Sequence, residues 1–268
     1  FHGKIVTVVR KSVNRGNTPD IRFVKKPLRV LFPHPGLAHN PFMKFLLSLL
    51  LVSFIAIASS ADPAPKSSST LPKVVLLGDS IRMNYQSAVT QALEGKAIVS
   101  APKDNCSHTA FVLENLERWL SGLEDAQVIH INVGLHDMFL NPKTGKPRHT
   151  LETYETNLRA IFERLRKLTD AELIFAMTSV VNEEQQAASK GYGRVVRRNS
   201  DIQTYNAAAL AVLEEFGVVM NDLNRFMKKT GPEKILRSSD GIHLSPEGCE
   251  IMGIEVARVI LENLNTGE

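Results

Sequence analysis

The sequence predicts an α/β protein built on a parallel β-sheet, and two observations support this fold class. Short apolar segments rich in β-branched residues alternate with longer amphipathic segments from residue 73 onward, which is the pattern of βαβ units. Several short segments are apolar at consecutive positions, as expected for strands covered on both faces. The length of 268 residues and the 43% hydrophobic content suit one folded domain and argue against a disordered, collagen-like or multispanning membrane protein.

Five segments are predicted as strands because they are short and apolar. They are Lys73–Leu77, Ala97–Ser100, Val128–Val133, Leu173–Thr178 and Val218–Met220. Amphipathic spacing predicts helices between and after these strands. They are Tyr85–Leu93, Ala110–Leu120, Leu151–Leu168, Asp201–Phe216 and Pro246–Leu264. Gly217 is expected to end one helix in a left-handed cap, and Ser245 to cap the helix that begins with Pro246.

The chain before the first strand resembles an export leader followed by a linker. Lys44 precedes an apolar run from Phe45 to Ala58, and small residues follow up to Ala61, which is the order of regions in a secretory signal peptide. The run is shorter than the ~20 residues that span a membrane. We therefore expect a secreted or periplasmic protein with no membrane span after cleavage. The expected divisions are a non-native upstream segment or extended leader at 1–42, a signal peptide at 43–61 starting at Met43, a Pro- and Ser-rich linker at 62–72 and the folded domain at 73–264.

The charge of the folded part differs in sign from that of the whole chain. Residues 1–61 hold nine of the 32 basic residues and one of the 28 acidic residues. The remaining 23 basic and 27 acidic residues give residues 62–268 a net charge of −4. A nucleic-acid partner is therefore not indicated.

The first predicted strand runs directly into Gly78-Asp79-Ser80. In a parallel sheet, reactive groups lie beyond the carboxyl ends of the strands. Ser80 would stand near the start of the next helix, where free backbone N–H groups can stabilise an oxyanion. The tripeptide is also common in ordinary turns, where Asp79 or Ser80 would only cap a helix.

Two further segments carry polar groups at the same predicted edge. Before the last helix, Asp240 precedes His243 by three residues on a turn tightened by Gly241, so the carboxylate can meet one imidazole nitrogen and leave the other to accept a proton. After the third strand, Gly134 allows close approach of a substrate to the backbone, and His136 can present a ring N–H to a developing negative charge.

Taken together, G-D-S, the Gly134–Asp137 segment and D-x-x-H resemble the SGNH (GDSL-type) hydrolase family across residues 73–264. The resemblance implies a three-layer α/β/α sandwich with a five-stranded parallel sheet, of flavodoxin-like type. It also implies a catalytic triad in which Ser80 is the nucleophile, His243 the general base and Asp240 its orienting carboxylate. The oxyanion hole would use the N–H of Ser80, the N–H of a small residue after the second strand, and the third segment with Gly134 and His136.

Two departures from the family pattern concern the oxyanion hole. His136 stands where the family usually has Asn, and its hydrogen-bonding reach and charge differ from those of an amide. The second block usually offers a Gly, but residues 101–109 contain none. Asn105 or Cys106 is predicted at this position, and Cys106 would donate through its backbone N–H.

Residues expected to contact the substrate are Asp79, Asn105, Asn182 and Arg197. The last two lie in the polar stretch 180–200, which is interpreted either as a solvated surface loop or as a rim of the site. Cys106 and Cys249 could form a disulfide in an oxidising compartment, but their spacing gives no framework pattern.

No metal or cofactor is expected. His108, His130, His136 and His243 occur without H-x-x-x-H or C-x-x-C spacing, and His130 falls inside a predicted strand, as core histidines do. The sequence thus predicts an exported serine esterase acting on small-molecule or glycan esters, with short acetyl esters on carbohydrates favoured. The alternatives are a lysophospholipase, a thioesterase, an acyl transferase, or a catalytically silent carbohydrate-binding module.

Overall fold

A computed structural model describes residues 71–191 and 196–264 and contains the predicted parallel sheet. Its five strands lie in the order β2-β1-β3-β4-β5 and pair in parallel. They are β1 Lys73–Gly78, β2 Ile98–Ser100, β3 Val128–Asn132, β4 Glu172–Ala176 and β5 Val219–Asn221. The fold class is confirmed, and the strands differ from the predicted ones only at their ends.

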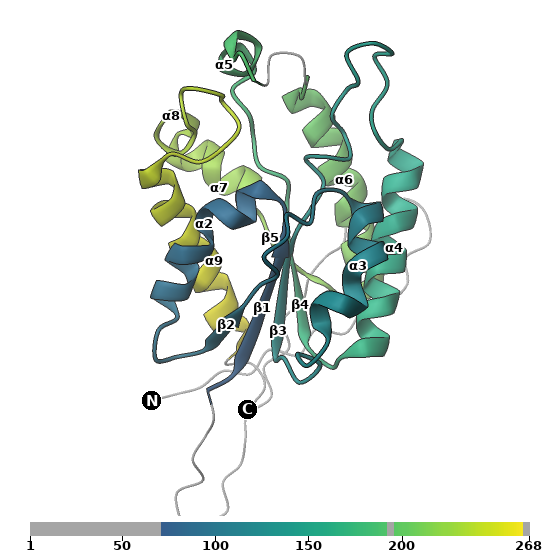
Figure 1. Cartoon of the computed structure of the whole chain (residues 1–268), viewed down its shortest axis with the longest axis vertical. Helices are drawn as coiled ribbons and strands as arrows, with labels where there is room; N and C mark the ends of the chain where they lie inside the picture. The colour runs from purple at the N-terminus through teal and green to yellow at the C-terminus, as the bar shows by residue number, and fades with distance from the viewer. Residues whose placement is uncertain (1–70, 192–195, 265–268) are drawn as a thin grey trace, which may run out of the picture. The chain divides into compact units, whose positions relative to one another are not determined.

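Helices cover both faces of this sheet, which gives three layers (Figure 1). One face carries α2 and α9, and the other carries α3, α4 and α6. The helices are α2 Ser80–Ala92, α3 Thr109–Leu120, α4 Leu151–Leu168, α5 Glu183–Ala188, α6 Asn199–Phe216, α7 Leu223–Thr230, α8 Pro232–Ile235 and α9 Pro246–Leu264. The expected leader and most of the expected linker lie outside the described residues.

The register of the sheet aligns the ends of four strands. Gly78 pairs with Asn132, Asn132 with Ala176, and Ala176 with Asn221. The apolar positions of the central strands are buried between the helix layers, which is why they read as continuous hydrophobic runs. The segments that leave β1, β3 and β4 therefore emerge side by side at one edge, the upper end of the sheet in Figure 1.

Several helix boundaries depend on side-chain caps. The side chain of Asp79 accepts the Ile81 N–H at 2.9 Å, so α2 begins at Ser80, earlier than predicted. Gly217 ends α6 in the left-handed conformation, with φ of 61°, as predicted. The hydroxyl of Ser245 accepts the Gly248 N–H at 2.9 Å and caps α9, also as predicted.

Three short helices, α5, α7 and α8, were not predicted. The stretch 180–200, interpreted from its sequence as a surface loop or a rim of the site, contains a helix, because Asn182 accepts the Gln185 N–H at 3.0 Å and starts α5. Asp222 caps α7 in the same way by accepting the Arg225 N–H at 2.9 Å. Such caps are ordinary turn signals in sequence, and tertiary packing decides whether a helix follows them.

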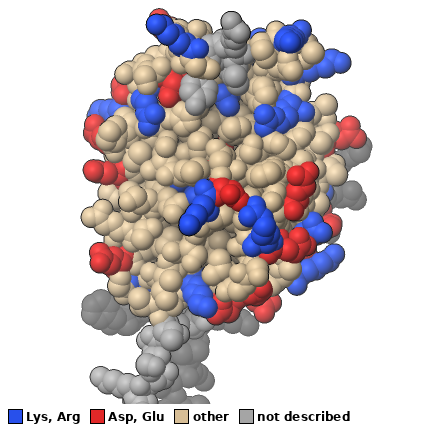
Figure 2. Space-filling model, viewed as in Figure 1, with Lys and Arg blue, Asp and Glu red and all other residues tan. Residues whose placement is uncertain are grey.

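Among the described residues, charged side chains of both signs lie at the surface and the two cysteines are unpaired. Figure 2 shows basic and acidic side chains interspersed over the face in view. Cys106 is buried and Cys249 half-buried, and both are free thiols. Within residues 71–191 and 196–264, no helix has the length and apolar character needed to cross a membrane.

The packing of α2 on α9 depends on Gly253. A Cβ added there would lie 2.4 Å from Cβ of Ala88 and 3.0 Å from the backbone nitrogen of Val89, both in α2. Contacts this short cannot be relieved by a flexible side chain, because the neighbouring atoms belong to the backbone or directly adjoin it. Gly253 therefore sets how closely the two helices approach.

We expect Gly253→Ala to lower the free energy of unfolding by about 1–3 kcal/mol, as overpacking does. Alanine is otherwise favoured over glycine inside a helix by about 1 kcal/mol, so a loss of stability identifies a packing effect. Urea unfolding followed by circular dichroism measures this change. Gly191→Ala is the control, because an added Cβ there meets no atom within 4 Å. A Gly253→Ala protein as stable as the parent would contradict the prediction.

Candidate active site

Ser80 stands where β1 turns into α2. Gly78 is required in this turn because an added Cβ would lie 2.6 Å from Cβ of Arg82 and 2.8 Å from the carbonyl oxygen of Asn132. Ser80 is the first residue of α2, so its backbone N–H has no acceptor within the helix. The hydroxyl is half-buried at the carboxyl edge of the sheet.

The turn before α9 brings a carboxylate and an imidazole together. Oδ1 of Asp240 accepts the backbone N–H groups of Ile242 and His243, both at 2.8 Å. Gly241 has a left-handed φ of 66°, and an added Cβ would lie 2.5 Å from the carbonyl oxygen of Asn182. Oδ2 of Asp240 lies 3.2 Å from Nδ1 of His243, so the carboxylate also orients the imidazole.

The opposite nitrogen of this imidazole reaches the serine. Nε2 of His243 lies 3.0 Å from Oγ of Ser80. With the Nδ1 proton directed to Asp240, Nε2 is the acceptor and the Ser80 hydroxyl is the donor. Burial works to raise the pKa of Asp240, but the N–H groups of His243 and Ile242 outweigh it and hold that pKa below its usual value. The carboxylate therefore stays ionised beside the imidazole.

The side chain of Asn84 fixes the distance between the two halves of this relay. Its Oδ1 accepts the Leu244 N–H at 3.0 Å. Asn84 lies one turn after Ser80 on α2, and Leu244 follows His243. One helix thus carries the hydroxyl and holds the turn that carries the imidazole. Sequence reasoning missed Asn84, because nothing nearby in sequence marks it as a contact of the last loop.

His136 lies half-buried near this relay and is neutral. Its pKa is lowered to about 3, chiefly by burial and in addition by the positive charges of Arg197 and Arg148. The charge of His243, when protonated, acts on the pKa of His136 in the same direction. At neutral pH His136 therefore carries one ring N–H. This group can donate one hydrogen bond, as one N–H of an amide side chain can.

A buried carboxylate anchors the segment that follows His136. Asp137 is 0% exposed, and its oxygens accept the N–H and hydroxyl of Thr109, the latter at 2.5 Å, and lie 2.7 Å from Nδ1 of His149. Thr109 is the first residue of α3. Asp137 therefore ties the loop after β2 to the loop after β3, which is a role that sequence reasoning missed.

The predicted oxyanion role of the Cys106 backbone is corrected by the structure. The Cys106 N–H donates to the carbonyl oxygen of Gly78 at 3.0 Å, so it is not available to a substrate. The neighbouring Ser107 has a φ of 54° and is the only non-glycine in the described part of the chain with a positive φ. The glycine-like conformation that the family pattern suggests for this loop therefore occurs at Ser107. Its N–H donates to Oδ1 of Asn105 at 2.9 Å.

Three of the four residues predicted to contact the substrate make contacts within the protein. Asp79 is 1% exposed and caps α2, and Asn182 caps α5 and packs against Gly241. Arg197 is 5% exposed, and its Nε donates to the carbonyl oxygen of Leu135 at 3.1 Å. Of the four, Asn105 alone is exposed. Burial thus excludes direct substrate contact through the Asp79 carboxylate.

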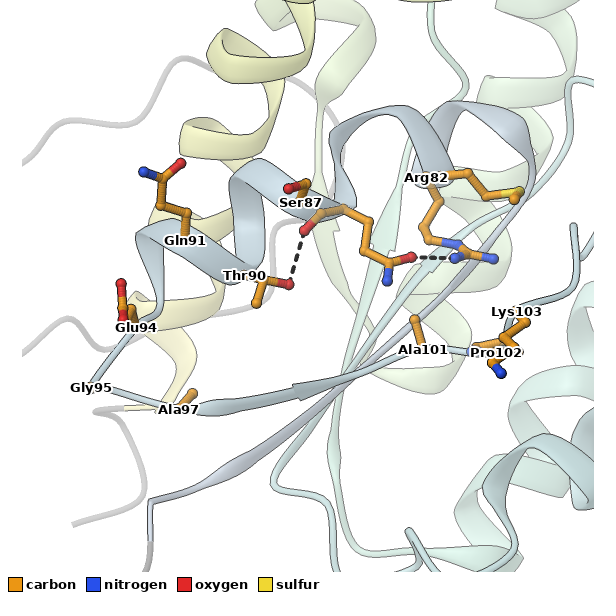
Figure 3. Close-up of a pocket in the computed structure, with 12 residues that line it drawn as sticks. Arg82, Ser87, Thr90, Gln91, Glu94, Gly95, Ala97, Ala101, Pro102 and Lys103 are labelled. Atoms are coloured by element: carbon orange, nitrogen blue, oxygen red, sulfur yellow. Dashed lines mark hydrogen bonds between the residues drawn. The ribbon is translucent and has the colours of Figure 1, made fainter.

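Other polar groups lie away from the relay. His130 is fully buried in β3, 3.2 Å from the side-chain nitrogen of Asn221, and burial lowers its pKa to about 3. A surface hollow between α2 and the β2 edge is lined by Arg82, Thr90 and Lys103, among others, but not by Ser80 or His243 (Figure 3). No group of three His, Cys, Asp or Glu side chains within the described ranges is placed to bind a metal ion.

Comparisons with known proteins agree with this geometry. Residues 76–251, which include the serine and the D-x-x-H turn, match the model of the GDSL-like Lipase/Acylhydrolase family. A GDSL esterase/lipase of Arabidopsis thaliana is 29% identical over 208 residues, covering 71% of this chain and 86% of that protein. An isoamyl acetate-hydrolyzing esterase 1 homolog of Bos taurus is 29% identical over 195 residues, covering 68% and 78%. Among solved structures, an acetyl xylan esterase has a TM-score of 0.55 at 16% identity and covers 70% of this chain and 99% of that one.

The buried Asp79 carboxyl makes the stability of the fold depend on pH. Burial is the main cause that raises its pKa, to about 6, against the lowering effects of the Ile81 N–H and the charge of Arg197. An acid whose pKa is higher in the folded chain stabilises the fold when protonated. This contribution is full below the unfolded pKa of about 4 and is lost as the pH rises through 6.

We expect Asp79→Asn to remove the loss of stability that ionisation of Asp79 causes, because an amide oxygen can still cap α2 but the amide does not ionise. Between pH 4 and 7.5 the variant should gain on the order of 2 kcal/mol in free energy of unfolding relative to the parent. Urea unfolding at several pH values in this range measures the difference. Equal pH slopes for the two proteins would contradict the assigned protonation of Asp79.

Proposed function

The chain belongs to the GDSL-like lipase/acylhydrolase family and is a serine ester hydrolase, and we propose that it cleaves short-chain, chiefly acetyl, esters through an acyl-enzyme on Ser80. The observation that carries this proposal is the continuous relay from Asp240 through His243 to the serine hydroxyl, with separations of 3.2 and 3.0 Å. These distances match the requirement that a base lie within hydrogen-bond reach of the proton that it removes.

The proposed reaction proceeds in two balanced halves. Oγ of Ser80 attacks the ester carbonyl while Nε2 of His243 accepts the hydroxyl proton, and the resulting imidazolium is stabilised by Asp240. Collapse of the tetrahedral intermediate releases the alcohol, which takes the proton from His243. A water molecule then attacks the acyl-enzyme with the same base, and the carboxylic acid leaves with Ser80 restored.

An oxyanion hole of three donors fits the arrangement around Ser80. Among the described residues, neither the Ser80 N–H nor the Gly134 N–H has a hydrogen-bond acceptor, so both are free to receive a negative oxygen. Gly134 has a φ of 142°, and an added Cβ would lie 2.5 Å from Oγ1 of Thr178, so only glycine fits. We assign the third donor to the neutral imidazole of His136.

The preference for short acyl groups is supported by the name of a relative. The bovine protein is named for hydrolysis of isoamyl acetate, an acetyl ester. Para-nitrophenyl esters of increasing chain length test this part of the proposal. A preference for long chains would favour the lysophospholipase or thioesterase alternative instead.

Export and a carbohydrate substrate are the finer parts of the proposal. Export is supported by the leader pattern of residues 43–61, and a carbohydrate ester is an accessible substrate outside the cell. Amino-terminal sequencing of protein recovered from outside the cell should give a first residue close to Asp62. Recovery of the protein solely inside the cell would overturn this part and leave the esterase proposal intact.

Ser80→Ala should lower kcat on para-nitrophenyl acetate by at least about 10³-fold, because the nucleophile is lost while the fold is kept. A fluorophosphonate probe should label the parent and fail to label the variant. Ser87→Ala is the matched control, since Ser87 is an exposed serine on the same helix. Turnover by Ser80→Ala at the parent rate, or labelling of that variant, would contradict the assignment of the nucleophile.

His136→Ala should lower kcat by about 10²-fold with a smaller change in KM, as loss of one oxyanion donor does. His136→Asn should recover most of the rate, because an amide also supplies one N–H. Since the pKa of His136 is about 3, its removal should leave the pH dependence of kcat/KM between pH 5 and 9 unchanged in shape. A shifted acidic limb in His136→Asn would show that His136 titrates in that range.

A further inference from the structure

A guanidinium group lies on the outer side of the loop that flanks the nucleophile. Nη1 of Arg148 donates to Oγ of Ser107 at 3.4 Å, and its guanidinium carbon lies 4.4 Å from the ring centroid of Phe139. Ser107 follows Cys106, and the Cys106 N–H donates a hydrogen bond to the carbonyl oxygen of Gly78. Gly78 lies two residues before the nucleophile Ser80. The contact with Ser107 thus connects Arg148 to the loop that is bonded to the start of the nucleophile turn.

Backbone hydrogen bonds place Arg148 beside the segment that carries His136. The Arg148 N–H donates to the carbonyl oxygen of Phe139 at 3.1 Å, and the His149 N–H donates to that of Asp137, which follows His136, at 3.0 Å. The charge of Arg148 lowers the pKa values of both His108 and His136, and the charge of His243 also acts on His136. The guanidinium therefore belongs to a residue that adjoins the segment carrying the proposed oxyanion donor. An anion bound by Arg148 would lie within reach of a substrate whose ester group is at Ser80.

The charge of Arg148 is not neutralised by the protein. Within residues 71–191 and 196–264 no carboxylate forms an ion pair with it. The nearest acid that acts on it is Asp137, whose oxygens are already bound by Thr109 and His149. The Phe139 ring holds the guanidinium in place by a cation–π contact while the residue remains exposed.

We propose that Arg148 forms a subsite for an anionic group, a carboxylate or a phosphate, carried by the ester substrate. The planar fork of a guanidinium fits the paired oxygens of either group and binds them more strongly than neutral polar groups. The inference rests on the proposed esterase function and narrows its substrates to esters that bear a negative charge near the scissile bond. Arg197 lies on the same Phe139 ring, but it is buried, so Arg148 is the accessible cation.

The test uses three acetyl esters that differ only in the charged group. The probes are 3-acetoxybenzamide, 3-acetoxybenzoate and 3-acetoxyphenyl phosphate, whose hydrolysis is followed by release of the phenol. The measured quantity is kcat/KM for an anionic ester divided by kcat/KM for the amide. For at least one anionic ester this ratio should be about tenfold higher in the parent protein than in Arg148→Gln, mostly because KM for the anionic ester is lower in the parent. Raising the ionic strength should reduce this preference.

Two further variants separate charge from geometry. Arg148→Lys should keep part of the preference, because it retains the charge but loses the fork. Arg164→Gln is the control, since Arg164 lies on α4, pairs with Glu117 and loses the same unit of charge when replaced. Its ratio should equal that of the parent. Whichever of the two anionic probes shows the larger effect identifies its charged group, carboxylate or phosphate, as the preferred one.

The possible failures of the two proposals are distinguishable. Hydrolysis of the amide probe with equal ratios in parent and Arg148→Gln would overturn the anionic subsite and leave the esterase intact. Absence of hydrolysis of all three probes together with absence of fluorophosphonate labelling of Ser80 would overturn the esterase proposal itself. If Arg164→Gln lowered the ratio as much as Arg148→Gln does, the effect would come from the net charge of the protein. That result would also overturn the subsite.

Discussion

The hydrogen bond between Nε2 of His243 and Oγ of Ser80 joins two residues 163 positions apart, and the rest of the site is arranged around it. Its length depends on how α2, which begins with the serine, packs against α9, which follows the histidine. Gly253 lets these helices approach, and Asn84 ties the histidine turn to α2 with a further hydrogen bond. The packing of α2 on α9 over one face of the sheet therefore sets the distance between the serine and the histidine at its edge.

Burial gives the ionisable groups near the nucleophile different protonation states. Backbone N–H groups keep Asp240 ionised, whereas burial is the main cause that raises the pKa of the Asp79 carboxyl, beside Ser80, to about 6. His136 is kept neutral by burial and by two arginines. Because Asp240 stays ionised and His136 stays neutral, His243 is the group in this relay that accepts and returns a proton in the proposed reaction.

The parts of the molecule that sequence predicts well are those specified locally. The β1 run, the Gly217 cap and the Ser245-Pro246 helix start are each encoded within a few residues, and the structure contains all three. Asp240 and His243 share one short turn, so their meeting could also be predicted. The hydrogen bond of the Cys106 N–H could not be predicted, because its acceptor is the carbonyl group of Gly78, 28 residues earlier in the chain. Asn84 and Arg148 were missed for the same reason, since their hydrogen-bond partners, Leu244 and Ser107, lie 160 and 41 residues away in the chain.

The unusual histidine at position 136 and the exposed Arg148 are physically linked. A histidine in place of the usual asparagine acts as a steady hydrogen-bond donor only if it does not titrate near neutral pH, and nearby positive charge helps to keep it neutral. Arg148 supplies part of that charge, and the same charge at an exposed position attracts an anion. A bound anion would in turn offset the effect of Arg148 and raise the pKa of His136, but from a value near 3 that change leaves the imidazole neutral. The site can therefore combine a histidine donor with an anionic substrate without either feature disabling the other.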